Sequence, residues 1–177
     1  MIVPIRNEQE AKSHEVFNAL MWALSYPGEK QQTAHATLAS IGEALLDLET
    51  SFYTSDEPLA RTFLLTTAKA KPIAQADYLF FSSLNDETIA SFKELKRGNL
   101  LYPDHAATLI LGCKFTEGSS LELKGPGIET RTTLRNNLPL SFWQMRNQMR
   151  NYPLGWDVFL CDGQAIVGIP RTTEVNL

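Results

Sequence analysis

The feature that most constrains the fold is the alternation of two apolar patterns along the chain. In the first half, segments with helical apolar spacing alternate with short apolar runs typical of buried strands, such as Tyr78–Phe81 in "ADYLFFSS". In the second half, paired strand-like runs dominate. This order predicts an α/β fold with a mixed β-sheet flanked by helices. No repeat, linker or low-complexity tract interrupts it, so we expect residues 1–177 to form a single domain.

Two amphipathic helices are expected in the first fifty residues. The first lies in "EAKSHEVFNALMWALSYPG", where Pro27 and Gly28 supply the stop. Its apolar residues at helical spacing are Val16, Phe17, Leu20, Met21 and Leu24. The second runs from Thr37 to Leu48 and precedes a short strand in "TSFYTS". Its apolar residues are Leu38, Ile41, Ala44, Leu45 and Leu48.

Acidic and amide residues mark the starts of two further helices. Asp56, Glu57 and Pro58 favour a helix start, because acidic residues complement the positive end of the helix dipole and proline is tolerated in the first turn. Asn85 is expected to cap a helix near residues 87–95, which stops before Gly98.

The second half is expected to contain two hairpins and one helix. "AATLILGCKF" and "SLELKG" are predicted to pair across the tight "TEGSS" turn. The spacing of Leu140, Trp143, Met145 and Met149 predicts a helix from Pro139 to Arg150, with its arginines on a solvated face. The final hairpin, in "GWDVFLCDGQAIVGIP", turns at Asp162–Gly163.

Size and charge exclude several classes of function. A domain near 177 residues buries roughly 70% of the surface of its unfolded chain, so no disulfide is needed to complete a core. A formal charge of -4 and a pI near 5.4 do not favour nucleic acid as a partner. Neither a signal-peptide pattern nor a run of about 18 apolar residues occurs, so we expect no membrane association and a cytoplasmic location.

Cofactor and metal motifs are absent or incomplete. Cys113 and Cys161 stand alone, so two reduced, packed thiols are expected rather than a zinc site. "GPGIET", at residues 125–130, lacks the third glycine of a dinucleotide fingerprint and is interpreted as a turn. No phosphate-binding GxxxxGK[ST] loop is present. The sequence therefore predicts neither a metal nor a cofactor.

His105 is the histidine in the most suggestive context. It lies in "YPDHAAT" beside Asp104, shortly before a predicted strand that ends near Cys113. Acid–base or nucleophilic chemistry would require the fold to bring a base and an orienting group together. The alternative interpretation is a surface loop, and the spacing favours it.

The C-terminal "GIPRTTEV" raises the question of an anion site. Arg171 offers forked donors, and the hydroxyls of Thr172 and Thr173 add two more. Asp157 interrupts an apolar strand, so it must face outward or meet a donor, and Arg171 is the obvious candidate. The alternative is a structural role in closing the strand or packing between subunits. In that case Trp156 and Phe159 are expected to anchor a dimer contact.

Several motifs together resemble one known family. The C-terminal "YPLGWDVFLCDGQAIVGIPRTTEV" is similar to the ending of the PhnH family, a subunit of the bacterial carbon–phosphorus lyase system. The earlier "FNALMWALSYPG", "LLDLETSF", "GNLLYPDHAATLIL" and "LELKGPGIE" resemble the family pattern in the same order. The resemblance extends from about Phe17 to Val175.

The resemblance implies a fold like the large domain of PLP-dependent transferases, without the cofactor or its lysine. It also implies a homodimer and an accessory, non-catalytic subunit that joins the G, I and J subunits. That complex replaces the adenine of ATP with a phosphonate, which gives ribose 1-phosphonate 5-triphosphate. The alternative hypothesis is a stand-alone enzyme or binder of phosphate esters or nucleotides. It would use Arg171, Thr172, Thr173 and Asp157, with His105 as a further candidate.

Overall fold

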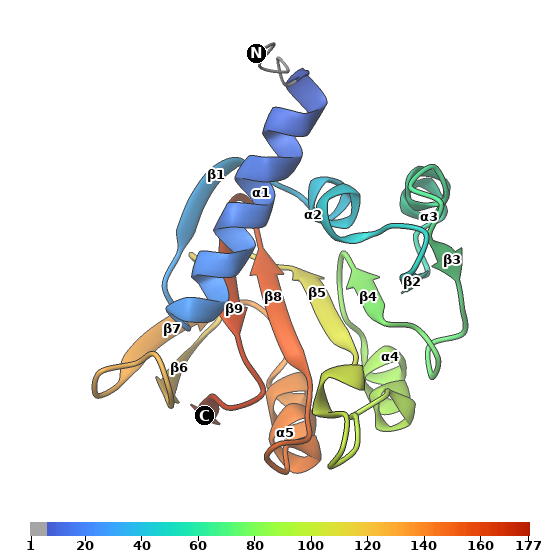
Figure 1. Ribbon diagram of the computed structural model, residues 1–177. Helices are drawn as coiled ribbons and strands as arrows, with labels where there is room; N and C mark the ends of the chain where they lie inside the picture. The colour runs from blue at the N-terminus through green and yellow to red at the C-terminus, as the bar shows by residue number, and fades with distance from the viewer. Residues whose placement is uncertain (1–6) are drawn as a thin grey trace.

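The computed structural model describes residues 7–177, which form a mixed α/β structure (Figure 1). Its α-helices are α1 (Glu8–Ser25), α2 (Leu38–Leu45), α3 (Glu57–Leu64), α4 (Asp86–Ser91) and α5 (Leu140–Met149). Two short 3₁₀ turns, η1 (Phe92–Glu94) and η2 (Pro103–His105), lie between α4 and the next strand.

A seven-stranded sheet forms the centre of the molecule. Its strands are β1 (Gln31–Ala36), β2 (Ser51–Thr54), β3 (Lys69–Ala70), β4 (Tyr78–Phe81), β5 (Thr108–Gly112), β8 (Asp157–Cys161) and β9 (Gly163–Ile169). They lie in the order β1-β9-β8-β5-β4-β2-β3, and β9 alone runs against the others. The mixed sheet predicted from the sequence is confirmed, as are the strand at residues 78–81 and the final hairpin.

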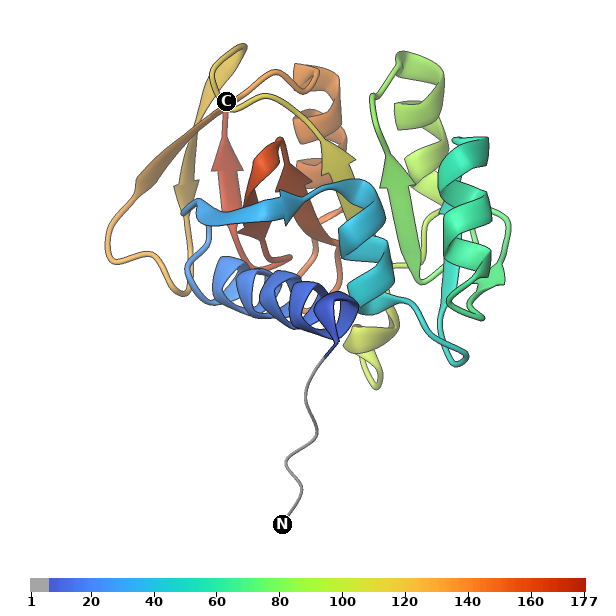
Figure 2. The ribbon, with the colours of Figure 1, turned by 90° about the horizontal axis from the view of Figure 1, so that it is seen from above.

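Two cores lie on the two faces of this sheet. On one face, α1, α2 and α3 cover residues such as Phe80, Ile110 and Phe159. On the other, residues of α4, η1 and α5 pack against Leu109, Val158 and their neighbours. Figure 2 shows α1 and α2 on one side of the sheet and α5 on the other. The central strands are buried on both sides, which explains why their sequences are continuously apolar.

The predicted pairing of the strand after Gly118 is wrong. The strands β6 (Ser119–Lys124), β7 (Thr132–Asn136) and β10 (Glu174–Asn176) form a separate three-stranded sheet in the order β10-β6-β7. β5 instead lies between β4 and β8 in the large sheet. The reason is burial: β5 is apolar on both faces, whereas β6 buries only alternate side chains, Leu121 and Leu123.

The helix starts follow the predicted chemistry. Asp56 and Asn85 each accept a hydrogen bond from a backbone N–H three residues on, at the first turns of α3 and α4. The structure adds β1 and β7, whose polar sequences gave no apolar pattern to predict them.

The apolar face expected for the first helix is partly wrong. Val16 and Leu20 are buried, but Phe17 and Met21 are nearly half exposed. The small Ala19 and Ala23 occupy the sheet-facing side instead. A Cβ on Gly168 of β9 would lie 2.6 Å from the Ala23 carbonyl group, so the helix lies directly against that strand. Close contact with the sheet therefore selects small residues and leaves the larger ones at the flanks.

Trp156 and Phe159 do not anchor a contact between subunits, because both side chains are buried within the chain's own cores. Among residues 7–177, no helix has the length and apolar character to cross a membrane.

Candidate functional site

The "PRTT" segment lies where the final hairpin returns to the amino-terminal end of β8. Ile169, the last residue of β9, lies opposite Val158 near the start of β8. The chain then turns at Pro170, with the Thr173 N–H donating to the Pro170 carbonyl at 2.9 Å. The antiparallel hairpin therefore places Arg171 beside Asp157.

Asp157 and Arg171 form a pair that is mostly shielded from solvent. The Arg171 backbone N–H donates to Asp157 Oδ1 at 2.8 Å, and Arg171 Nε lies 3.2 Å from each carboxylate oxygen. Arg171 Nη2 also donates to the carboxylate, and Nη1 donates to the Pro103 carbonyl. The partner predicted for Asp157 is confirmed. All three guanidinium nitrogens of Arg171 have acceptors inside the chain, and the two side chains are only 15% and 20% exposed.

Arg146 on α5 is a second arginine of this site, and the sequence prediction placed it wrongly. It was expected on a solvated face but is 2% exposed. Its Nη1 donates to the Thr173 carbonyl at 3.1 Å and its Nη2 to the Pro170 carbonyl at 2.7 Å. Burial, assisted by the charge of Arg150, lowers the pKa of Arg146 to about 10. The side chain is therefore still protonated at neutral pH and holds the turn at two points.

The threonines lie against the glycine turn at residues 125–127. Thr173 is fully buried, and within residues 7–177 its hydroxyl has no hydrogen-bond partner, while Thr172 is half-buried. A Cβ on Gly125, which has φ +151°, would lie 3.1 Å from Thr173 Cα. The turn interpretation of "GPGIET" is confirmed by the positive φ of Gly125 and Gly127. Close backbone packing against the C-terminal segment is one reason for glycine there.

His105 lies on an exposed turn, connected to this site through its neighbour. It ends η2, its ring stacks on Tyr102 with centroids 4.9 Å apart, and Pro103 in the same turn accepts from Arg171. Cys113 follows the far end of β5, about 15 Å or more away given the rise per residue of a strand. The structure does not bring His105 and Cys113 together, so the nucleophilic pairing considered from the sequence is wrong.

A hollow of about 430 Å³ lies at the opposite, carboxyl-terminal end of the parallel strands. Its lining includes Thr37, Lys114, Asp162 and the free thiols Cys113 and Cys161. Burial, with the charge of Asp162 adding to it, raises the pKa of both thiols to about 12. At neutral pH both thiols are therefore protonated and poor nucleophiles. In the described part of the chain, no group of three or more His, Cys, Asp or Glu side chains is arranged to hold a metal.

The burial of Arg146 has a signal in the sequence, which is its spacing from Trp143. Arg146 lies three residues after Trp143, so the two share a helix face, and Trp143 is fully buried. The contact with the Pro103 carbonyl had no comparable pointer, because a backbone acceptor 68 residues away leaves no trace in the sequence pattern.

Comparisons with known proteins agree over most of the chain. A family model described as "Bacterial phosphonate metabolism protein (PhnH)" matches residues 6–176. The chain is 27% identical over 176 residues to the "Putative C-P lyase subunit protein HtxG" of Stutzerimonas stutzeri, covering 96% of this chain and 88% of that protein. It is also 27% identical over 183 residues to the "Alpha-D-ribose 1-methylphosphonate 5-triphosphate synthase subunit PhnH" of Rhizobium meliloti (strain 1021), covering 93% and 90%.

Proposed function

Because the chain belongs to the PhnH family of bacterial phosphonate metabolism proteins, we propose that it is an accessory subunit of a carbon–phosphorus lyase complex. The observation that carries this proposal is a family match over nearly the whole chain, supported by two relatives whose names call them subunits. In this role the chain supports the formation of ribose 1-phosphonate 5-triphosphate from ATP and an alkylphosphonate in the breakdown of organic phosphonates.

The geometry of the arginine site supports an accessory role over a ligand-binding one. An anion at Arg171 would have to displace Asp157 and the Pro103 carbonyl, which already accept from every guanidinium nitrogen. A carboxylate beside the guanidinium also disfavours a second negative charge. Arg171, Thr172, Thr173, Asp157 and His105 are therefore proposed to maintain the shape of a subunit, and no observation favours a stand-alone phosphate-ester binder.

The proposed partners are the G, I and J subunits of the lyase. For the isolated chain we propose a cytoplasmic homodimer, with residues 1–177 acting as one domain. The flanks of α1 support self-association, because Phe17, Met21, Trp22 and Tyr26 are each between 45% and 52% exposed. Large apolar side chains gathered on one exposed element are typical of protein interfaces. A likeness to the large domain of PLP-dependent transferases is also proposed, and the mixed seven-stranded sheet supports it.

Co-purification tests the subunit role. The chain is expressed with an affinity tag together with the G, I and J subunits of the same bacterium, and the eluted proteins are identified by mass spectrometry. We expect the subunits to co-elute at a fixed ratio in size-exclusion chromatography. If the folded chain elutes without any of them, the proposed function is wrong.

A ligand-binding measurement tests the alternative function, a binder of phosphate esters or nucleotides. ATP and methylphosphonate are added separately to the wild type and to an Arg171→Ala variant, and the melting temperature is followed. The accessory role predicts no ligand-induced stabilisation of either protein. Stabilisation of the wild type that the variant loses would instead support the phosphate-ester binder.

A further inference from the structure

An exposed apolar loop lies beside the arginine site and is not explained by the packing of the chain. The loop at residues 98–103, "GNLLYP", follows η1 in the chain, ends at the first residue of η2 and lies at the amino-terminal end of the sheet. Leu100 is 78% exposed, Leu101 is 85% exposed and Tyr102 is 54% exposed. Single exposed apolar residues are common on protein surfaces, but three in succession on one tip are not.

The loop is built to keep this shape. Asn99 Oδ1 accepts from the backbone N–H groups of Leu101 at 2.9 Å and Tyr102 at 2.8 Å. The Asn99 N–H donates to the Tyr102 carbonyl at 3.1 Å, which closes the turn. Gly98 has φ +72°, and a Cβ there would lie 2.7 Å from the Pro103 carbonyl oxygen. The leucines are thus held outward by local hydrogen bonds rather than left exposed by a lack of structure.

The base of the loop is attached to the two C-terminal motifs. Arg171 of "PRTT" donates to the Pro103 carbonyl, and the N–H of Gly155 in "YPLG" donates to the Arg97 carbonyl at 3.4 Å. Asp157 holds Arg171 in turn. The mostly shielded pair of Asp157 and Arg171 therefore positions the loop, which gives the donor-rich motif a purpose other than binding an anion.

We propose that the loop at residues 98–103 inserts into an apolar groove with an acidic rim on another subunit of the lyase complex, an inference that rests on the proposed function. A convex tip that carries two leucines requires a concave apolar partner. The exposed Arg97 guanidinium at the base of the loop has Met149 Sδ, at 3.8 Å, as its one hydrogen-bond acceptor within residues 7–177. An acidic side chain beside the groove would complete this site.

A second copy of the chain is a poorer occupant. A two-fold contact through this tip would bring two convex surfaces together and place one Arg97 near its own symmetry mate. Like charges facing each other across an interface oppose association.

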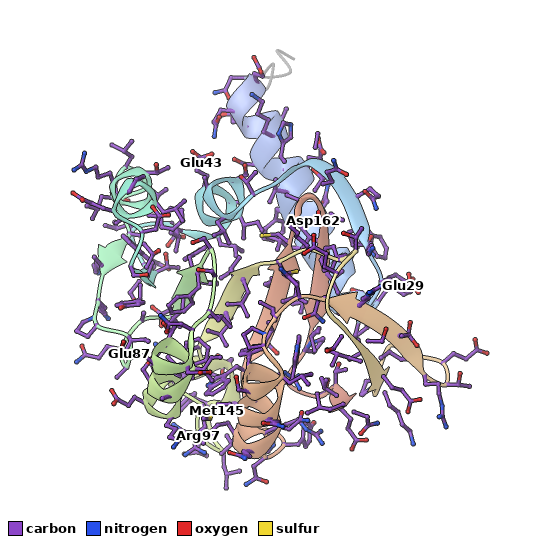
Figure 3. All side chains as sticks on the ribbon, turned by 180° about the vertical axis from the view of Figure 1, so that it is seen from behind. Glu29, Glu43, Glu87, Arg97, Met145 and Asp162 are labelled. Carbon is purple, nitrogen blue, oxygen red and sulfur yellow. The ribbon has the colours of Figure 1, made fainter. Side chains whose placement is uncertain are left out.

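Figure 3 shows where the base of the loop lies. Arg97 is towards the same end of the molecule as Met145 of α5, away from Asp162 at the carboxyl end of β8.

A pair of leucine variants tests the proposal. Leu100→Ser with Leu101→Ser removes the apolar tip. Leu64→Ser with Leu65→Ser removes a matched pair at the end of α3, where exposures are 54% and 84%. We expect the first variant to bind the G, I and J subunits at least tenfold more weakly than the wild type in surface plasmon resonance, and the second to bind like the wild type. Both should keep the wild-type melting temperature.

Arg97→Glu provides a second variant that leaves the loop intact. It should weaken binding at least threefold and reverse the salt dependence of association, because it places a negative charge against the acidic rim. The inference is overturned if the wild type binds but neither change at residues 97, 100 and 101 weakens the complex. It is also overturned if these variants alter only self-association. If the wild type itself does not bind, the proposed function fails first and the inference fails with it.

Discussion

The two ends of the seven-stranded sheet use their polar groups in opposite ways. At the amino-terminal end, each nitrogen of the Arg171 guanidinium meets an acceptor from within the chain, and the buried Arg146 holds two carbonyls of the same turn. At the carboxyl-terminal end, a hollow lies open to solvent, lined by Asp162 and two protonated thiols. In Figure 1, the arrowheads of β8, β5 and β4 point away from α5, which lies at the other end of these strands.

This difference shows how a donor-rich motif acquires its role from the fold. In open α/β sheets, ligands usually bind outside the carboxyl-terminal ends of the strands. The motif that suggested an anion site lies at the other end, where Asp157 and the Pro103 carbonyl accept from Arg171. The arginines therefore hold a turn and a loop in place. The hydrogen bonds that they donate stabilise the shape of the chain, and the donors in these bonds are not free to bind a ligand.

The largest effect is expected from removing the buried arginine. Arg146→Ala leaves the Thr173 carbonyl without a donor, leaves the Pro170 carbonyl with only the Thr173 N–H, and opens a cavity under the turn. A buried acceptor left unpaired costs about 1–3 kcal/mol and the cavity adds to this cost, so we expect the free energy of unfolding to fall by about 3–5 kcal/mol. Urea denaturation followed by far-ultraviolet circular dichroism measures this change.

Arg135→Ala is the matched control. Arg135 is exposed and donates to a single carbonyl, that of Gly118, so its loss should cost less than about 1 kcal/mol. If the free energy of unfolding falls as little for Arg146→Ala as for Arg135→Ala, the buried arginine does not stabilise the amino-terminal end. The contrast between the two ends of the sheet would then lose its main support.

A smaller effect is expected from neutralising one carboxylate at each end of β8. Asp157→Asn removes the charge that holds Arg171 in a mostly buried pair and should cost about 2 kcal/mol. Asp162→Asn changes the exposed turn at the other end. There the side chain accepts from the N–H groups of Gln164 and Ala165 at 2.9 and 2.8 Å, which an amide oxygen can also do. We therefore expect a change below about 0.5 kcal/mol at Asp162.

Urea denaturation of both variants at neutral pH measures this difference. A larger cost at Asp162 than at Asp157 would reverse the comparison between the two ends of the sheet.

The sequence predicts the layers of the fold better than its connections. Helical spacing and capping residues such as Asp56 and Asn85 act within one turn, so local pattern suffices to place those helix starts. The partner of β6 could not be predicted in this way, because it depends on whether β5 is buried on both faces by helices far away in sequence. β1 has a polar sequence because it forms an edge of the sheet, and no apolar pattern marks it.

In the candidate site, too, some contacts could be predicted from the sequence and others could not. The pairing of Asp157 with Arg171 was predictable, because a carboxylate in an apolar strand needs a donor and a hairpin brings the two together. The acceptors at Pro103, Pro170 and Thr173 are backbone groups, which every residue carries. Which of these carbonyls accept from Arg171 and Arg146 depends on the folded chain and not on residue type.

The smaller effect of the two ion pairs at the amino-terminal end is expected at a second pair, which is more exposed than Asp157 and Arg171. Asp77, just before β4, accepts from Lys96 and from the hydroxyl and N–H of Ser51. Burial on its own would raise the pKa of Asp77, but these hydrogen bonds and the ammonium charge outweigh it, so the pKa lies below its usual value. A carboxylate with a depressed pKa stabilises the fold above its unfolded pKa of about 3.9, and this contribution is lost as the pH falls through the lower folded value.

Asp77→Asn should therefore lower the free energy of unfolding at pH 7 by less than about 1 kcal/mol, because the Lys96 and Asp77 side chains are 29% and 41% exposed. The difference from the wild type should shrink between pH 4 and pH 3, where the wild-type carboxylate begins to take up a proton. Urea denaturation across this range measures it, with Asp86→Asn on the exposed start of α4 as the control. If the difference in free energy of unfolding between the wild type and Asp77→Asn stays constant down to pH 3, the charge of Asp77 does not contribute to stability. Shielding from solvent would then not explain why Asp157 contributes more than Asp77 at the same end of the sheet.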